Sequence, residues 1–166
     1  ERPFSPPQKA KRNNMENSNE NLNRNQNIAI TLGDPAGIGI EVILKALGSS
    51  ELPKKMNPLL VGCRKSLETT HNKLKKRGIK ALPDLNEITI FDIPLKANIT
   101  PGKPSLESGA ASFHWLTTAT QLVLQGKARA LVTGPIAKER WHEAGHYYPG
   151  QTERLAELSN TQEVSM

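Results

Sequence analysis

Residues 28–47 read IAITLGDPAGIGIEVILKAL, and this stretch decides the fold. Its first five residues form a short β-type run, which predicts a strand over residues 28–32. Residues 37–47 carry apolar side chains at helical spacing, which predicts a helix with one apolar face. The side chains expected on that face are Ile38, Val42, Ile43, Ala46 and Leu47. A glycine-rich loop, residues 33–39 (the first loop), joins the strand to the helix.

The remainder of the chain repeats this alternation of strand and helix. Further strands are expected at residues 58–62, 87–91 and 128–133, and a last strand is expected to begin over 163–166. Further helices are expected at residues 65–77, 106–125, 136–144 and 152–159, with Ser105 and Gly126 suited to the two ends of the longest. Strands that alternate with helices predict an α/β fold with a largely parallel sheet.

A second loop, residues 133–138 (TGPIAK), follows the predicted strand at 128–133 as the first loop follows the strand at 28–32. In parallel sheets the ligand site lies at the carboxyl ends of the strands, so both loops are expected at that edge. Glycines permit close backbone approach and helix N-termini attract anions, so the first loop suits a phosphate or carboxylate. A plain tight turn is the alternative, because the loop matches neither the dinucleotide fingerprint nor the P-loop.

Several polar residues of these loops have two interpretations each. Asp34 either orients a ligand group or accepts backbone hydrogens. In the second loop, Thr133 suits a helix cap and Pro135 suits the first helical turn. Lys138 lies near the start of the predicted helix, where a cation is mildly unfavourable. It therefore either meets an anionic ligand or is a plain surface lysine.

Residues 150–153 (GQTE) form a third candidate, where a loop enters a helix. Gln151 and Thr152 present an amide and a hydroxyl group there, to a polar ligand or only to the start of the helix. The four histidines make no convincing metal set. His142 and His146 have i, i+4 spacing, but Gly145 lies between them and the helix is expected to end there.

Composition bounds the class of protein. The chain has 166 residues, which suits one domain or slightly more. Apolar residues make up 36%, below the roughly 45–50% of a compact domain. Residues 1–27 form an Asn-rich tail that is expected to be disordered, and residues 28–166 form the body. The tail has five Lys or Arg and three Glu, a charge of +2, which leaves +4 of the net +6 for the body. That mild charge suits an anionic substrate, and no basic run alternates with aromatic residues as nucleic-acid binding needs.

Cysteine and hydropathy patterns bear on the compartment. Cys63 is the single cysteine, so no disulfide can form within the chain, and a cytoplasmic location is expected. Cys63 follows a short apolar run, which favours a buried structural thiol over a nucleophile. No stretch approaches the roughly 20 apolar residues that span a bilayer, so no membrane partner is expected.

Four motifs in order resemble the 4-hydroxythreonine-4-phosphate dehydrogenase family, over about residues 28–166. They are GDPAGIG at 33–39 with Glu41, PGKPS at 101–105 with Gly109, TGPI at 133–136 with Lys138, and AG at 144–145 followed by GQTE at 150–153. Each motif alone is modest, whereas four in the right order are specific.

The resemblance implies a fold similar to isocitrate and isopropylmalate dehydrogenases, with two α/β domains, a homodimer and an active site in the cleft between domains. It implies oxidation of 4-phosphooxy-L-threonine by NAD or NADP, then decarboxylation to 3-amino-2-oxopropyl phosphate, in pyridoxal phosphate (vitamin B6) biosynthesis. It also implies a divalent metal, Zn, Mg or Co, held by three histidines that lie outside this chain.

The resemblance carries over to two site residues. The family's GHTE element supplies substrate contacts through its His and Thr; here Thr152 matches the Thr, and Gln151 replaces the His. An amide cannot become a cation, so an anion bound at Gln151 would lose charge assistance. Ile40 also replaces a usual Pro. Family members are longer than this body, so the chain as given is expected to be catalytically incomplete.

Two other functions stay open at this point. One is a related dehydrogenase that acts on another phosphorylated or carboxylated hydroxy acid, with Gln151 as the residue that differs. The other is a non-catalytic module that binds phosphate or nucleotide.

Overall fold

The computed structural model describes residues 27–53, 56–161 and 164. Its first two elements are the strand β1, Asn27–Thr31, and the helix α2, Gly39–Leu47. Both elements lie where the sequence predicts them, and β1 begins one residue earlier than expected. Asn27 therefore belongs to the sheet, and its carbonyl accepts a hydrogen bond from the Arg129 amide at 2.9 Å. The rest of the predicted tail, residues 1–26, lies outside the described residues.

The other predicted elements are present, with ends shifted by one or two residues. They are β2, Asn57–Gly62; α3, Arg64–Lys76; β3, Thr89–Asp92; α4, Leu106–Leu124; β4, Ala130–Val132; α5, Lys138–Glu143; and α6, Gln151–Ser159. Ser105 caps α4 as predicted, because its hydroxyl accepts a hydrogen bond from the Ser108 amide at 3.3 Å. The strand expected to begin over 163–166 falls on residues that are mostly outside the described ones.

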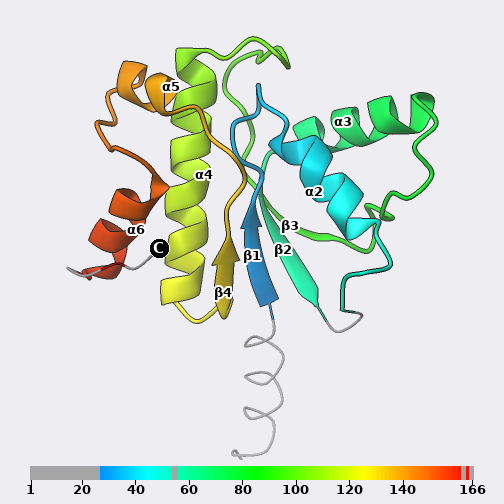
Figure 1. The fold of residues 1–166 in the computed structure, drawn as a ribbon, viewed down its shortest axis with the longest axis horizontal. Helices are drawn as coiled ribbons and strands as arrows, with labels where there is room; N and C mark the ends of the chain where they lie inside the picture. The colour runs from blue at the N-terminus through cyan, green and yellow to red at the C-terminus, as the bar shows by residue number, and fades with distance from the viewer. Residues whose placement is uncertain (1–26, 54–55, 162–163, 165–166) are drawn as a thin grey trace, which may run out of the picture.

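The four strands form one parallel sheet in the order β3-β2-β1-β4. Figure 1 shows α4 along one side of the sheet, with α5 and α6 beyond it, and α2 and α3 on the other side. This arrangement confirms the predicted α/β fold. Helices on both faces explain why β1 and β2 are apolar along most of their length rather than alternating with polar residues.

Two clusters of buried side chains lie on the two faces of the sheet. On one face, Ile30 and Leu60 pack with residues of α2 and α3, including Leu44 and Leu67. On the other face, Ala29, Leu59 and Val61 pack against Ala119 and Leu122 of α4. None of the described helices is both long and apolar enough to cross a bilayer.

The predicted apolar face of α2 is partly wrong. Ile38 precedes the helix and is 67% exposed, and Val42 is 50% exposed, whereas Ile40, Ile43 and Leu44 are buried. Apolar residues are so frequent between positions 38 and 47 that two helical phases fit the pattern. The phase that the fold selects starts at Ile40 and continues at i+3 and i+4.

The apolar run at 128–133 forms a shorter strand than predicted, and that strand is only partly buried. β4 covers three residues at the edge of the sheet, with Leu131 half-buried and Val132 51% exposed. Ala128, just before β4, is buried under α4. A short apolar run cannot by itself distinguish a central strand from an edge strand.

Candidate functional site

The order of strands reverses beside β1. The chain moves from β1 through β2 to β3 at one edge, and then returns through α4 to place β4 on the other side of β1. In open parallel sheets, ligands bind at such a reversal, outside the carboxyl ends of the strands. The first and second loops leave β1 and β4 at this point (Figure 1), so both lie at the edge where the sequence predicts them.

The two loops are joined through their backbones. The Asp34 amide donates to the Pro135 carbonyl at 2.9 Å, and the Gly134 amide donates to the carbonyl and hydroxyl oxygens of Thr31 at 3.1 and 3.0 Å. Gly33 has a φ of +74°, and a Cβ there would lie 2.4 Å from the Pro135 carbonyl oxygen. Gly33 is therefore explained by the second loop, and it is not a sign of a phosphate cradle.

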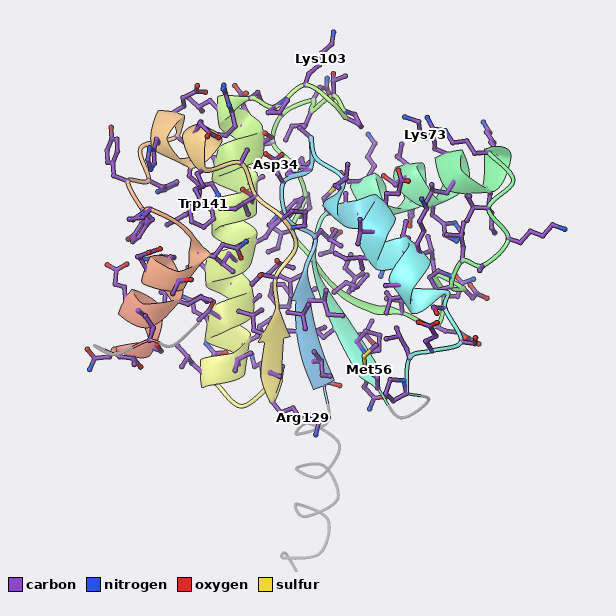
Figure 2. All side chains as sticks on the ribbon, in the orientation of Figure 1. Asp34, Met56, Lys73, Lys103, Arg129 and Trp141 are labelled. Atoms are coloured by element: carbon purple, nitrogen blue, oxygen red, sulfur yellow. The ribbon has the colours of Figure 1, made fainter. Side chains whose placement is uncertain are left out.

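Asp34 ties the first loop to the beginning of α4. Its carboxylate is buried and accepts hydrogen bonds from the Ala36 amide at 2.8 Å and the Ser108 hydroxyl at 3.2 Å. Figure 2 shows Asp34 at this end of the molecule, close to α4. Of its two interpretations, the structure supports acceptance of protein hydrogens. The segment before α4 is held as well, because the Gly102 amide donates to the Ala36 carbonyl at 2.7 Å.

α6 brings Gln151 against the second loop. The Gln151 Nε2 donates to the Gly134 carbonyl at 3.2 Å, so the third candidate segment meets the joined loops. The Gln151 Oε1 is buried, and it has no hydrogen-bond partner among the described residues. Thr152 follows in the first turn of α6 and is half-buried. The two residues predicted to bind substrate thus lie beside the reversal point of the sheet.

Lys138 adds a cation to the same place. Its side chain reaches Gly150. A Cβ added to Gly150 would lie 3.9 Å from Lys138 Nζ and 3.4 Å from a carboxylate oxygen of Glu153. The predicted capping role of Thr133 is wrong, because the N-cap of α5 is Ala137 and the helix begins at Lys138. The second loop is longer than expected, and it remains irregular while it packs on the first loop.

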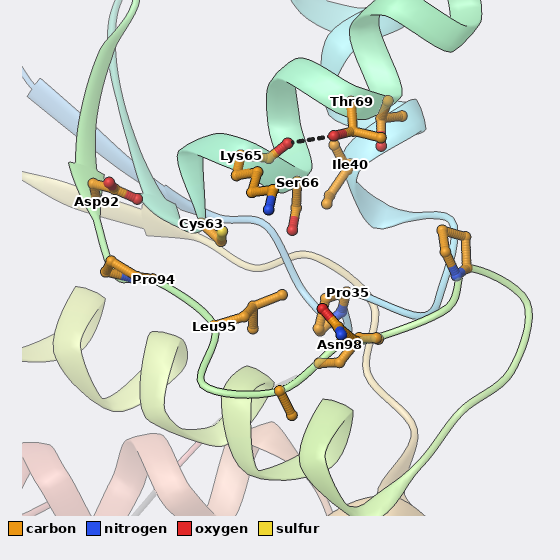
Figure 3. A pocket seen from close by; sticks show the side chains of 14 residues that line it. Pro35, Ile40, Cys63, Lys65, Ser66, Thr69, Asp92, Pro94, Leu95 and Asn98 are labelled. Atoms are coloured by element: carbon orange, nitrogen blue, oxygen red, sulfur yellow. Dashed lines mark hydrogen bonds between the residues drawn. The ribbon is translucent and has the colours of Figure 1, made fainter.

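A pocket of about 430 Å³ opens beside the first loop, at the carboxyl ends of β2 and β3 (Figure 3). Pro35 and Ile40 form its wall toward the first loop, and Lys65 and Ser66 line it from the start of α3. No sequence pattern predicts this pocket, because its other wall is the irregular segment 94–101.

Cys63 also lines this pocket and is 4% exposed, as expected for a buried thiol. Burial raises the pKa of the Cys63 thiol. Hydrogen bonds from the Ser66 hydroxyl and from the backbone amides of Ser66, Leu95 and Lys65 lower that pKa further than burial raises it, so its pKa lies below the usual value.

His142 and His146 make separate contacts and do not face a common site. His142 bonds the Tyr148 carbonyl at 3.0 Å, and the His146 ring stacks on Phe113 with ring centres 3.6 Å apart. Gly145, with a φ of +84°, follows α5 and separates the pair. Across residues 27–53, 56–161 and 164, no three His, Cys, Asp or Glu side chains cluster as metal ligands. The described residues therefore do not fit a metal site.

Arg154 holds α6 on α4, which the sequence did not indicate. Its guanidinium lies 4.8 Å from the centre of the Phe113 ring and bonds the Glu157 carboxylate at 2.6 Å. The indole of Trp141, on α5, donates to the buried Ser112 hydroxyl of α4 at 2.8 Å. These contacts fix the segment that carries Lys138 and Gln151.

Comparison with known families gives the context for this site. The family model described as pyridoxal phosphate biosynthetic protein PdxA matches residues 47–166. The chain belongs to the PdxA family. The match includes the second loop, α5 and α6.

Curated relatives of this PdxA chain carry dehydrogenase names. It is 55% identical over 139 residues to the 4-hydroxythreonine-4-phosphate dehydrogenase of Synechococcus sp. (strain RCC307), covering 84% of this chain and 42% of the relative. It is 40% identical over 149 residues to a protein of Oceanobacillus iheyensis whose name gives D-threonate 4-phosphate as its candidate substrate, covering 84% of this chain and 45% of the relative. The PdxA chain thus spans under half the length of these relatives.

Solved structures agree with the fold. The 4-hydroxythreonine-4-phosphate dehydrogenase of Burkholderia phymatum superposes with a TM-score of 0.73 at 31% identity, over 84% of this PdxA chain and 45% of that chain. The enzyme of that name from Klebsiella pneumoniae gives a TM-score of 0.72 at 34% identity, over 84% and 45% of the two chains.

Proposed function

We propose that the protein carrying these residues oxidises 4-phosphooxy-L-threonine with NAD or NADP, and that the product then loses CO₂ to give 3-amino-2-oxopropyl phosphate for pyridoxal phosphate biosynthesis. One observation carries the proposal. The second loop and the start of α6, which the family model includes, meet the first loop at the reversal point of the sheet. This is where a parallel sheet receives a small ligand.

The residues of this chain contribute binding and orientation. Lys138 supplies a positive charge for the phosphate or carboxylate of the substrate, and Gln151 and Thr152 supply polar groups beside it. A nicotinamide cofactor bound beside these residues would supply the acceptor for the hydride of the hydroxyl-bearing carbon. Gly33 and Gly134 allow the close contact between the two loops. The proposal of a nicotinamide cofactor is therefore based on the family and not on a glycine-lined phosphate site in this structure.

Further parts of the proposal concern the whole protein. We propose a homodimer and a divalent metal (Zn, Mg or Co), both of which rest on the resemblance to the family. The described residues do not by themselves fit a metal site. A cytoplasmic location is proposed because the one thiol, Cys63, is free.

A chimera provides the direct test. Residues 28–166 replace the aligned segment of the Synechococcus relative, and formation of NADH or NADPH is followed with 4-phosphooxy-L-threonine and Mg²⁺, Zn²⁺ or Co²⁺. Turnover by the chimera, and none by residues 1–166 alone, is expected. A folded chimera without turnover would contradict the proposal, and binding of NAD⁺ by residues 1–166 in calorimetry would then favour a non-catalytic module.

A second substrate is favoured by one observation. The Oceanobacillus relative is named for D-threonate 4-phosphate, in which a hydroxyl replaces the amino group of the threonine compound. Gln151 is neutral in the family's histidine position, so it imposes no charge on that part of the ligand. The ratio of kcat/KM for the two substrates in the chimera decides between them, and Gln151→His is expected to change that ratio.

A further inference from the structure

The side-chain amide of Gln151 has a fixed orientation. Its Nε2 lies 3.2 Å from the Gly134 carbonyl oxygen. A rotated amide would place Oε1 against that carbonyl, where two oxygen lone pairs would face each other, so only the nitrogen is compatible with this contact. The orientation of the Gln151 amide therefore follows from a backbone atom of the second loop.

This orientation leaves a buried acceptor. The Gln151 Oε1 has no donor among the described residues, and it is the one buried side-chain oxygen or nitrogen in that part of the chain without a partner. Buried polar atoms in native proteins are almost always hydrogen-bonded, because burial removes the water that would otherwise serve them. The missing donor must come from outside the described residues.

The surroundings identify the kind of molecule that brings the donor. Lys138 Nζ and a Glu153 carboxylate oxygen both lie close to Gly150, the residue before Gln151, at 3.9 and 3.4 Å from a Cβ added there. A cation therefore lies near two acceptors, the Glu153 carboxylate and the neutral Gln151 Oε1. An anionic oxygen suits Lys138 but would be repelled by the lone pairs of Oε1. A hydroxyl or ammonium group has the opposite preference. A ligand that satisfies both carries an acid group and a donor on the same small skeleton.

We infer that Gln151 is a specificity residue that accepts a hydrogen bond from a hydroxyl or ammonium group of the ligand, while the anionic end of the ligand lies toward Lys138. The inference rests on the proposed function for the position of the ligand. It agrees with the expectation that an anion bound at Gln151 would lose charge assistance. A histidine in this position can carry a positive charge, whereas Gln151 offers its free oxygen.

The test removes the donors from the ligand one at a time. O-phospho-L-homoserine lacks the hydroxyl group of 4-phosphooxy-L-threonine, and 3-hydroxy-4-phosphooxybutanoate lacks its ammonium group. Dissociation constants for the three compounds are measured by NMR titration of residues 1–166 and of the chimera. Native protein is expected to lose roughly tenfold in affinity for one of the two truncated compounds, which corresponds to one hydrogen bond. The compound that loses affinity identifies the donor.

Variants then assign the loss to Gln151. In Gln151→Met, which has no acceptor, the same truncated compound should bind within about twofold of the intact one, because the hydrogen bond is already absent. Gln125→Met is the matched control: Gln125 is exposed at the end of α4, and this variant should retain the full native loss. Amide spectra of each variant report that it is folded.

The outcomes separate this inference from the proposed function. An equal loss in native protein and Gln151→Met, or no loss for either truncated compound, overturns the inference while the ligand still binds. If none of the three compounds binds the chain or the chimera, the proposed function is overturned, and the inference with it. The ligand truncations in native protein decide the question even if a variant does not fold.

Discussion

Replacing Gly134 by alanine should disrupt the contact between the first and second loops. A Cβ at position 134 would lie 2.7 Å from both the Gly33 nitrogen and the Thr31 carbonyl oxygen. Both neighbours are backbone atoms of a buried segment, so neither can move as a side-chain end would. The methyl group therefore forces β1 and the second loop apart.

The magnitude follows from what that separation breaks. The Gly134 amide bonds Thr31, and the Asp34 amide bonds the Pro135 carbonyl. Each such hydrogen bond contributes about 1 kcal/mol net, and overpacking in a filled interior costs roughly 1–3 kcal/mol. Gly134→Ala should thus lower the free energy of unfolding by about 2–4 kcal/mol. Gly33→Ala should cost at least as much, because its φ of +74° adds strain.

Urea unfolding of the chain, followed by tryptophan fluorescence and circular dichroism, measures this loss. Gly37→Ala is the matched control in the first loop, since a Cβ there would lie 3.3 Å from the Asp34 carbonyl oxygen and no closer to other atoms. We expect Gly37→Ala to cost less than about 1 kcal/mol. If Gly134→Ala and Gly37→Ala were equally stable, the close contact between the loops would not be a real constraint on this fold.

Three further changes test the packing around the site. Ser112→Ala should cost about 1–3 kcal/mol, because it leaves the buried Trp141 indole N–H without its acceptor; an unchanged urea midpoint would contradict this. The pKa of His146 lies below its usual value, first because of burial and then because of the Arg154 charge. At pH values between this lowered pKa and the ordinary pKa of about 6.5, the histidine therefore takes up a proton when the protein unfolds. Stability should therefore fall as pH drops below that ordinary value, and His146→Asn should remove this part of the pH dependence of the urea midpoint. Leu67→Ala should cost about 2–5 kcal/mol by calorimetric or urea unfolding, since Leu67 is 1% exposed in the core; a loss below about 1 kcal/mol would refute that assignment.

Much of the fold could be predicted because its signals are local. The apolar run of β1, the cap at Ser105 and the glycine that follows α4 each act within a few residues. The placement of the two loops at one edge then followed from a general property of parallel sheets.

The errors concern properties that depend on distant parts of the chain. Whether Val132 lies in a central or an edge strand depends on which strands pair with β4, and its own sequence does not contain that information. The phase of α2 depends on which side chains the sheet buries. The contact of Asp34 with Ser108 joins positions 74 residues apart, and no spacing rule predicts it.

The place of Gln151 in the fold was predictable, but its contacts were not. Sequence and resemblance predict that Gln151 and Thr152 bind substrate, and the structure sets Gln151 beside the joined loops. Which end of the Gln151 amide is available depends on the Gly134 carbonyl, a backbone atom whose direction is set by tertiary packing. A residue type alone therefore could not state whether this position donates or accepts.

The glycine-rich loops have a role that differs from the one their composition suggests. If Gly33 and Gly134 made room for a ligand, a Cβ added to either would point into open space at the edge of the sheet. Instead, each added Cβ would meet the backbone of the other glycine's loop. If Gln151 binds the ligand as we infer, the loops act on ligand binding indirectly, by fixing the Gly134 carbonyl that orients Gln151. It follows that Gly134→Ala should also weaken the discrimination between the intact and truncated phosphates, whereas Gly37→Ala should preserve it. Loss of discrimination in both variants would show that the first loop contacts the ligand directly.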